Sequence, residues 1–233
     1  MQHIIKNYLI LCAAVLLLAV GMALIVCAEE EGDWSYDVYD SKATITSYHG
    51  TEKALVLPEA LGGYKVTSIG KSAFEGNITL ETVTLPDTIS SIGDRAFQDC
   101  SALTEIVLSG NLESIGTSAF HASKLKSVVI PDSVTYIGSY AFENCTGLRS
   151  VSIGCGVLEW GNDWGTNAAF RGCTLLTSLE IAEGVQSIGT YAFQGCTLLL
   201  DTELPSTVVE VGEGAFKDCE LLDTIITYGS IAI

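Results

Sequence analysis

Cysteine is the residue type whose spacing most suggests chemistry here, because a thiol can bind a metal, attack a substrate or form a disulfide. Five of the eight cysteines stand three residues after a phenylalanine: Cys100, Cys145, Cys173, Cys196 and Cys219. They lie at least 23 residues apart, whereas metal sites use closer pairs such as Cys-x-x-Cys, so we expect no metal and no cofactor. We expect a ladder of buried, reduced thiols, with a disulfide such as Cys173–Cys196 as the alternative.

The remaining reactive side chains do not form a catalytic set. His49 and His121 lie several repeats apart, and we expect no serine or cysteine in contact with either of them, as nucleophilic catalysis would require. Cys155 has no positive neighbour in the sequence that would activate its thiol. The acidic residues considered as acid–base pairs are not paired: Asp94, Asp163 and Asp218. The sequence therefore predicts that the protein is not an enzyme.

A repeat positions all of these residues. Ala-Phe recurs at intervals of 23, 23, 22, 28, 23 and 23 residues, with its phenylalanine at Phe74, Phe97, Phe120, Phe142, Phe170, Phe193 and Phe216. An Ile-Gly or Val-Gly pair stands upstream of most of these phenylalanines, and a leucine stands downstream. Such a fixed period is the signature of a solenoid, in which each coil buries its apolar residues against the next coil.

Each repeat contains one clear strand pattern. In LETVTL (80–85) and LTEIVL (103–108) the apolar and polar residues alternate, as they do in strands. Pro86, Pro131 and Pro205 should end their strands, because proline cannot donate a ladder hydrogen bond. We expect the recurring glycine to supply a positive φ at a tight corner. The predicted fold is a right-handed, parallel β-rich solenoid of the leucine-rich-repeat type, with short helical or irregular turns.

The outward residues of these strands form the candidate binding surface. Successive coils present Thr84, Val107, Val129, Ser152, Glu180, Glu203 and Ile226 at equivalent positions. Solenoids commonly bind extended partners along such a face, which favours a protein or glycan ligand. The alternative is a solvated strand face with the ordinary preference of strands for Thr and Ser.

The segment EWGNDWGTNAAF (159–170) interrupts the repeat with five extra residues. In the repeat register, Trp160 replaces a core isoleucine, so we expect it to pack inside. Trp164 falls among the extra residues and has no inward position. We expect Trp164 on a protruding loop, where an exposed indole could anchor a protein or a sugar ring. The alternative is that it folds back over the neighbouring coil.

The unit I-G-x-x-A-F-x-x-C-x-x-L-x-x-V-x-I-P resembles the BspA-type leucine-rich repeat. The resemblance covers residues 59–233 in about seven units, and the segment 29–58, with YDVYDSKATITSYHG (36–50), resembles the capping segment that precedes the first repeat in that family. The resemblance implies a secreted or surface-exposed protein of a host-associated microbe. It also implies an adhesion or protein-interaction module rather than an enzyme.

The N-terminus and the charge limit where the protein acts and what it binds. Residues 1–28 contain one lysine and an apolar run from Tyr8 to Val26, which predicts a secretory signal peptide or, alternatively, a retained membrane anchor. The remaining chain carries 28 acidic and 10 basic residues, a net charge of −18, which argues against nucleic acid and anionic membrane surfaces as partners. We expect an adhesion or protein-interaction module. A structural surface protein that self-associates through its open solenoid edge is the alternative.

Overall fold

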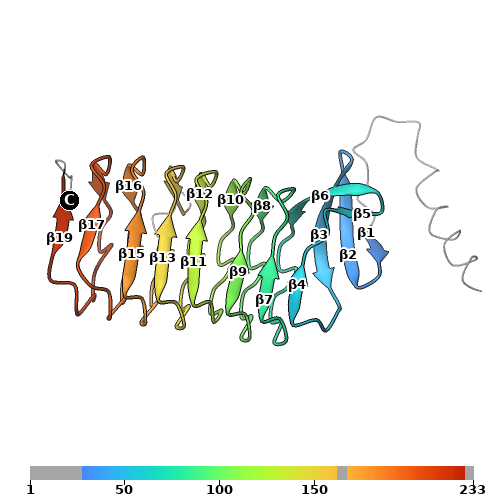
Figure 1. Ribbon diagram of the computed structural model, residues 1–233, viewed down its shortest axis with the longest axis horizontal. Coiled ribbons are helices and arrows are strands. Elements are labelled where there is room, and N and C mark those ends of the chain that lie inside the picture. The colour runs from blue at the N-terminus through green and yellow to red at the C-terminus, as the bar shows by residue number, and fades with distance from the viewer. Residues whose placement is uncertain (1–27, 162–166, 229–233) are drawn as a thin grey trace, which may run out of the picture.

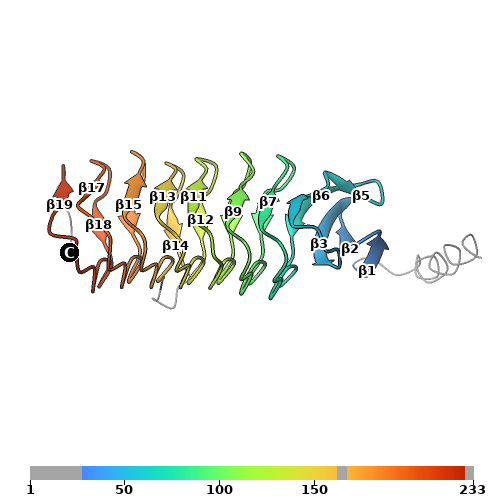
Figure 2. The same ribbon diagram turned by 60° about the horizontal axis from the view of Figure 1, so that its bottom comes forward.

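The protein is a parallel β-solenoid of about eight turns, seen in a computed structural model that describes residues 28–161 and 167–228. Figure 1 shows the coils lying side by side along one axis, and the turned view in Figure 2 shows the same row. The described residues contain no helix. The predicted solenoid fold is therefore confirmed, and its turns are non-helical.

An antiparallel hairpin covers the N-terminal end of the row. Strands β1 (Ala28–Glu31), β2 (Trp34–Tyr39) and β3 (Lys42–Tyr48) pair in sequence, and β3 then pairs in parallel with β6 (Tyr64–Ile69), which also pairs with β5 (Ala60–Leu61). The rings of Trp34 and Tyr48 lie against Phe74, with centroid distances of 6.3 and 5.8 Å. The hairpin therefore closes the apolar interior of the first coil.

The predicted strands form one side of the solenoid, which we call the strand face. They are β4 (Ala54–Val56), β7 (Thr82–Thr84), β9 (Glu105–Val107), β11 (Ser127–Ile130), β13 (Ser150–Ile153), β15 (Ser178–Ile181), β17 (Thr202–Leu204) and β19 (Ile225–Thr227). Their hydrogen bonds form three separate sheets, β4-β7-β9, β11-β13-β15 and β17-β19. Neighbouring strands are therefore unpaired at two places, between β9 and β11 and between β15 and β17.

Six coils also contain a second, two-residue strand, which the sequence pattern did not reveal. These strands are β8 (Ser91–Ile92), β10 (Ser114–Ile115), β12 (Tyr136–Ile137), β14 (Glu159–Trp160), β16 (Ser187–Ile188) and β18 (Glu210–Val211). They continue the sheet that runs from β1 through β2 and β3 to β6. The pairing stops between β14 and β16, and β16 then pairs with β18. The isoleucine of each Ile-Gly pair is thus the inward residue of a strand.

The Ala-Phe turns form the most regular side of the solenoid. At each junction between coils three backbone N–H groups donate to carbonyls of the next coil, as Arg95, Phe97 and Asp99 do to Thr117, Ala119 and His121 at 2.7–2.9 Å. The seven phenylalanine rings stack in one column with centroids 4.7–5.4 Å apart. We call this side the turn ladder.

The expected reason for the recurring glycine was wrong. The glycine of the Ile-Gly pair does not have a positive φ in any of the described repeats except at Gly161, where the pair is Trp-Gly. A Cβ atom at Gly138 would instead lie 2.5 Å from the backbone of Gly116 in the preceding coil. Glycine is required because the backbones of successive coils approach too closely for any side chain. The left-handed residues lie further on, at positions such as Arg95 and Asp99.

Candidate functional site

The strand face places the predicted outward residues in one column. Thr84 lies opposite Val107, Ser152 lies opposite both Val129 and Glu180, and Glu203 lies opposite Ile226. Thr84 and Ser152 are half-buried and the others are exposed. The alternation of inward and outward side chains explains why their register could be derived from the sequence.

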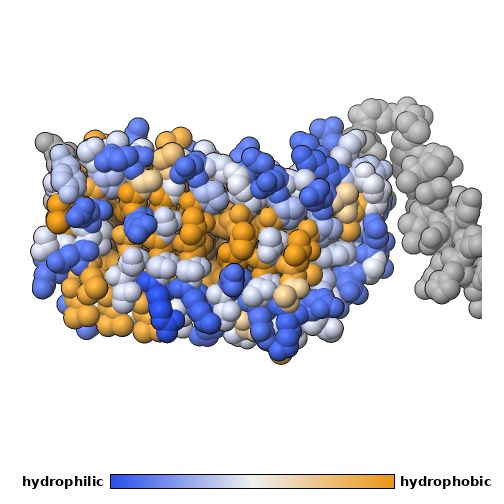
Figure 3. Space-filling view, viewed as in Figure 1, coloured by the Kyte–Doolittle hydropathy of each residue, from blue (hydrophilic) through white to orange (hydrophobic). Residues whose placement is uncertain are grey.

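The column changes in character along the solenoid. Its N-terminal part is mostly apolar, because Val56, Val107 and Val129 are 70%, 49% and 67% exposed, and its C-terminal part carries Glu180 and Glu203. Figure 3 shows hydrophobic residues along the middle of this face with hydrophilic residues beside them. Exposed apolar side chains that gather on one face of a strongly acidic protein make this face the candidate interaction surface. Val56 belongs to this surface, and sequence reasoning did not include it.

A groove of about 570 Å³ crosses the apolar part of the strand face between β9 and β11. Its walls include Val107, Leu108, Val129 and Pro131. The two strands form no ladder here, although the Lys126 N–H donates to the Thr104 carbonyl at 3.0 Å just before them. The groove coincides with the repeat that is one residue short, so the irregular spacing of the sequence has a structural counterpart. Two charged residues, Glu105 and Lys126, also line the groove.

The cysteine ladder lies inside the solenoid. Cys100, Cys145, Cys173 and Cys196 are buried, Cys219 is half-buried, and all five are free thiols. Each thiol donates to a phenylalanine carbonyl of a preceding coil at 3.1–3.4 Å. Two repeats have another residue at the cysteine position, Asn77 and Ser123, and the Ser123 hydroxyl lies 3.2 Å from the sulfur of Cys145.

Burial determines the protonation of these thiols. Desolvation raises the pKa of Cys100 and of Cys145 to about 12, and it raises the pKa of Cys173 and Cys196 in the same direction. A thiol with so high a pKa is protonated at neutral pH and is a poor nucleophile. The arrangement therefore suits packing and hydrogen bonding between coils rather than chemistry.

Cys155 differs from the ladder because it is exposed. Its backbone N–H donates to Asp132 Oδ1 at 2.9 Å. A hydrogen bond with the Asp132 side chain, together with that carboxylate's charge and some desolvation, raises the pKa of the Cys155 thiol. The neighbourhood thus opposes formation of the thiolate, which agrees with the absence of an activating cation in the local sequence.

The expectation that no serine would contact a histidine was wrong. Ser35 Oγ and His49 Nε2 lie 2.9 Å apart in the N-terminal hairpin. Sequence reasoning missed this pair because it did not anticipate that β2 and β3 would pair and bring residues 35 and 49 together. Among the described residues no carboxylate is hydrogen-bonded to the other ring nitrogen of His49, so the pair lacks the group that orients the imidazole in a catalytic triad.

His121 belongs to a charged cluster on the turn ladder. Glu143 accepts from Arg171 Nε at 2.7 Å, and its other oxygen lies 3.6 Å from His121 Nε2. The Arg171 guanidinium also lies 5.2 Å from the centroid of the Tyr140 ring. These residues come from three successive coils, so the cluster joins coils across the 22- and 28-residue repeats.

Many acidic side chains also join coils rather than facing a ligand. The Thr117 N–H donates to Asp94 Oδ1 at 2.8 Å, one coil away. Further carboxylates accept a backbone N–H from the following coil in the same way: Asp87, Asp132, Glu183 and Asp201. Part of the acidic composition is therefore explained by hydrogen bonds that satisfy corner N–H groups.

Two predicted features lie outside the described residues. Trp164 is one, and the predicted signal peptide or anchor, apart from Ala28, is the other. Trp160 is described, and it is buried with its ring 6.5 and 6.3 Å from those of Phe170 and Phe193. Within residues 28–161 and 167–228 no cluster of His, Cys, Asp and Glu could hold a metal ion, and no helix is long and apolar enough to span a membrane.

Comparisons with known proteins agree with this architecture. A family model for the BspA type leucine rich repeat region matches residues 59–164 and 166–233 with six copies. A leucine-rich repeat protein of T. pallidum is 29% identical, with a TM-score of 0.65 over 87% of this chain and 86% of that one. A leucine-rich repeat protein of Bacteroides ovatus is 25% identical, with a TM-score of 0.70 over 84% of this chain and 52% of that one.

A more distant structure shows the fold alone. The pneumococcal vaccine antigen PcpA is 19% identical, with a TM-score of 0.53 over 87% of this chain and 70% of that one. No curated protein matches the chain. The similarity therefore extends over most of the described solenoid and concerns its repeats rather than a particular ligand.

Proposed function

Because this chain belongs to the BspA-type leucine-rich repeat family, we propose that it is a secreted or cell-surface adhesion module that binds an extended segment of another protein along its strand face. The family and the solenoid fold indicate an interaction module of a typically non-catalytic kind. The apolar run from Tyr8 to Val26 supports export from the cell.

The observation that carries the proposal is the apolar groove between β9 and β11. Val107 and Val129 are exposed on its rim and would lose water contact when a partner binds. Apolar side chains at the centre of an interface with polar residues around them are typical of protein recognition. Lys126 and Glu105 both line the groove, so a partner segment with apolar residues and a charge of each sign suits it.

Capture of epithelial matrix and mucus proteins tests the proposal. We expect the chain to capture a partner from this set and Val129→Glu to abolish the capture, because the substitution places a charge on the rim of the groove. Ser114→Glu is the control, since Ser114 lies on β10 in the second set of strands and does not line the groove. Equal binding by the wild-type chain and Val129→Glu would contradict the proposal.

Light scattering separates this function from a structural role. An adhesion module should stay monomeric across a concentration series while it captures its partner. Polymers that grow with concentration and are unaffected by Val129→Glu would instead favour a surface protein that assembles through the edge of its solenoid.

A further inference from the structure

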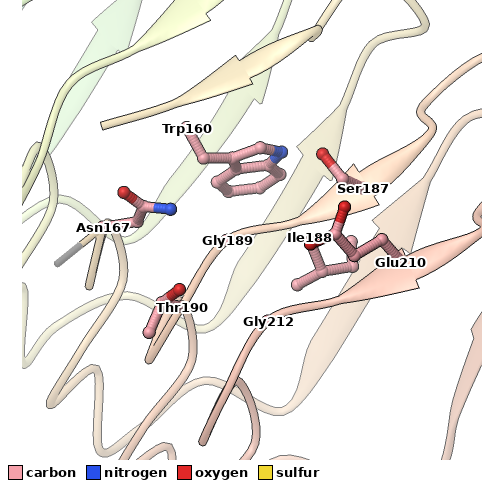
Figure 4. A pocket seen from close by; sticks show the side chains of 8 residues that line it. All are labelled: Trp160, Asn167, Ser187, Ile188, Gly189, Thr190, Glu210 and Gly212. Atoms are coloured by element: carbon pink, nitrogen blue, oxygen red, sulfur yellow. The ribbon is translucent and has the colours of Figure 1, made fainter. Parts of the chain in front are cut away.

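A small polar pocket lies among the second set of strands, outside the strand face. It lies where β14 and β16 fail to pair, and its volume is about 130 Å³. Trp160 from β14, Ser187 from β16 and Glu210 from β18 line it, together with Asn167 and Thr190. Figure 4 shows these side chains converging from three successive coils.

The indole of Trp160 is the unusual group in this pocket. Isoleucine stands at the equivalent positions Ile115 and Ile137, so a ring with a polar atom replaces an apolar side chain here. Trp160 is only 6% exposed, and its Nε1 is buried with no hydrogen-bond partner among the described residues. In Figure 4 this nitrogen lies at the end of the ring nearer to Ser187. A buried N–H donor without an acceptor is costly, so a small shift of the pocket wall that lets a ligand oxygen reach this N–H would be favoured.

The polar groups of the pocket restrict the chemistry of that ligand. The indole N–H and the Asn167 amide can donate, and the Glu210 carboxylate can only accept. The Glu210 carboxylate would repel an anion. The hydrogen-bond donors of the pocket would disfavour a cation. A hydroxyl group can accept from the indole and donate to the carboxylate at the same time. Several hydroxyls on one ring therefore satisfy the set better than any single charged group.

From these observations we propose that this pocket binds a neutral, hydroxyl-rich group, namely one sugar residue of a glycan. The volume has room for several waters or one such ring rather than for a large ligand. The indole and the polar side chains together provide the apolar and hydrogen-bonding contacts that small-molecule sites combine. This site is independent of the protein-binding groove, because the two are lined by different strands.

The indole N–H signal of Trp160 in a ¹⁵N NMR spectrum of the full chain tests the proposal, and Trp160→Phe identifies that signal. The probes are glucose, galactose, N-acetylglucosamine and N-acetylgalactosamine, with sulfate and choline as charged comparisons. We expect a saturable shift with at least one sugar and none with sulfate or choline. Glu210→Ala should weaken sugar binding about tenfold or more, as loss of a hydrogen bond to a charged group does.

Leucine substitutions at two equivalent serines, Ser187 and Ser114, provide the control. Ser187→Leu should fill the pocket and abolish the shift, whereas Ser114→Leu places the same side chain on β10, where the strand pairs on both sides and does not line this pocket. Glu210 is exposed, so Glu210→Ala keeps the test valid even if Ser187→Leu does not fold. The proposal is overturned if no sugar shifts the Trp160 signal, if sulfate or choline shifts it equally, or if Ser187→Leu and Ser114→Leu behave alike. Partner capture lost in Val129→Glu with sugar binding kept would show that the two sites are separate.

Discussion

The turn ladder and the strand face respond differently to irregular repeat length. The turn ladder keeps three backbone hydrogen bonds at every junction between Phe74 and Phe216, including the junctions made by the 22- and 28-residue repeats. The strand face loses its pairing between β9 and β11, at the 22-residue repeat, and also between β15 and β17, where the repeat has its regular length. The second set of strands loses its pairing between β14 and β16, at the 28-residue repeat. Both candidate sites lie at these interruptions. The turn ladder thus keeps the coils stacked, and the other two sides of the coils accommodate the changes in repeat length at which the candidate sites lie.

The largest expected effect is the difference in stability loss between a substitution in the turn ladder and one on the strand face. Phe142 is fully buried in the middle of the ring stack, and Phe142→Ala should lower the free energy of unfolding by about 3–5 kcal/mol, as such core truncations do. Val129→Ala on the strand face should change it by less than about 0.5 kcal/mol, as exposed substitutions do. Urea unfolding followed by circular dichroism measures both. Equal losses would show that the strand face is as important for stability as the turn ladder.

A glycine substitution tests whether close backbone approach holds the coils in register. Gly138→Ala places a Cβ atom 2.5 Å from the backbone of Gly116, and we expect a loss of about 1–3 kcal/mol, as overpacking causes. Gly110→Ala is the control, because the nearest atom to its Cβ is a side-chain oxygen of Asp87 at 3.6 Å. Thermal unfolding of the two variants should differ by several degrees. If Gly138→Ala is as stable as Gly110→Ala, the coils are not held as closely as described.

Features set by the local sequence could be predicted, whereas features set by contacts between coils could not. The register of Thr84, Val107 and Ser152 followed from strand alternation, and the inward place of Trp160 followed from counting residues. Glycine is needed at position 138 because the backbone of the neighbouring coil lies so close. A local sequence pattern cannot show the distance between two coils. The groove likewise depends on how β9 and β11 separate, and the contact between Ser35 and His49 depends on a hairpin. Two-residue strands such as β8 are too short for alternation to reveal.

The buried thiols predict a loss of stability at high pH. The pKa of Cys100 and of Cys145 is raised from about 9 to about 12 in the folded chain. Above pH 9 the unfolded chain releases these protons and the folded chain keeps them, so the free energy of unfolding should fall as pH rises from 9 to 12. Each thiol contributes about 1.4 kcal/mol per pH unit in this range.

Urea unfolding at pH 8, 9.5 and 10.5 measures the slope. Cys145→Ala should reduce the slope, because the variant no longer has that proton to release. Cys155→Ala should reduce it less, because the pKa of Cys155 is also raised but its thiol is exposed and solvent screens the effect. The raised pKa of Tyr36, about 12 against an ordinary value of 10, adds to the slope above pH 10 in every variant. A Cys145→Ala slope equal to that of the wild-type chain would mean that this thiol is accessible to water.

The smallest expected effect concerns strain within the turn ladder itself. Ala122 has a φ of 57°, two residues after Phe120, and the equivalent residues after Phe170 and Phe193 are Gly172 and Gly195 with φ of 71° and 72°. An alanine in the left-handed region costs about 1–2 kcal/mol, and glycine costs about 0.5–1 kcal/mol in lost chain entropy on folding. Ala122→Gly should therefore stabilise the chain by about 0.5–1 kcal/mol.

Ala102→Gly is the matched control, because Ala102 is also half-buried in a turn but has no positive φ. Ala102→Gly relieves no backbone strain, so it should destabilise the chain by about 0.5–1 kcal/mol. Thermal unfolding should move in opposite directions in the two variants. A gain at Ala122 would show that the turn ladder is stable despite its left-handed residues, because the three hydrogen bonds at each junction outweigh their strain. A loss there would mean that the Ala122 side chain makes contacts worth more than the strain.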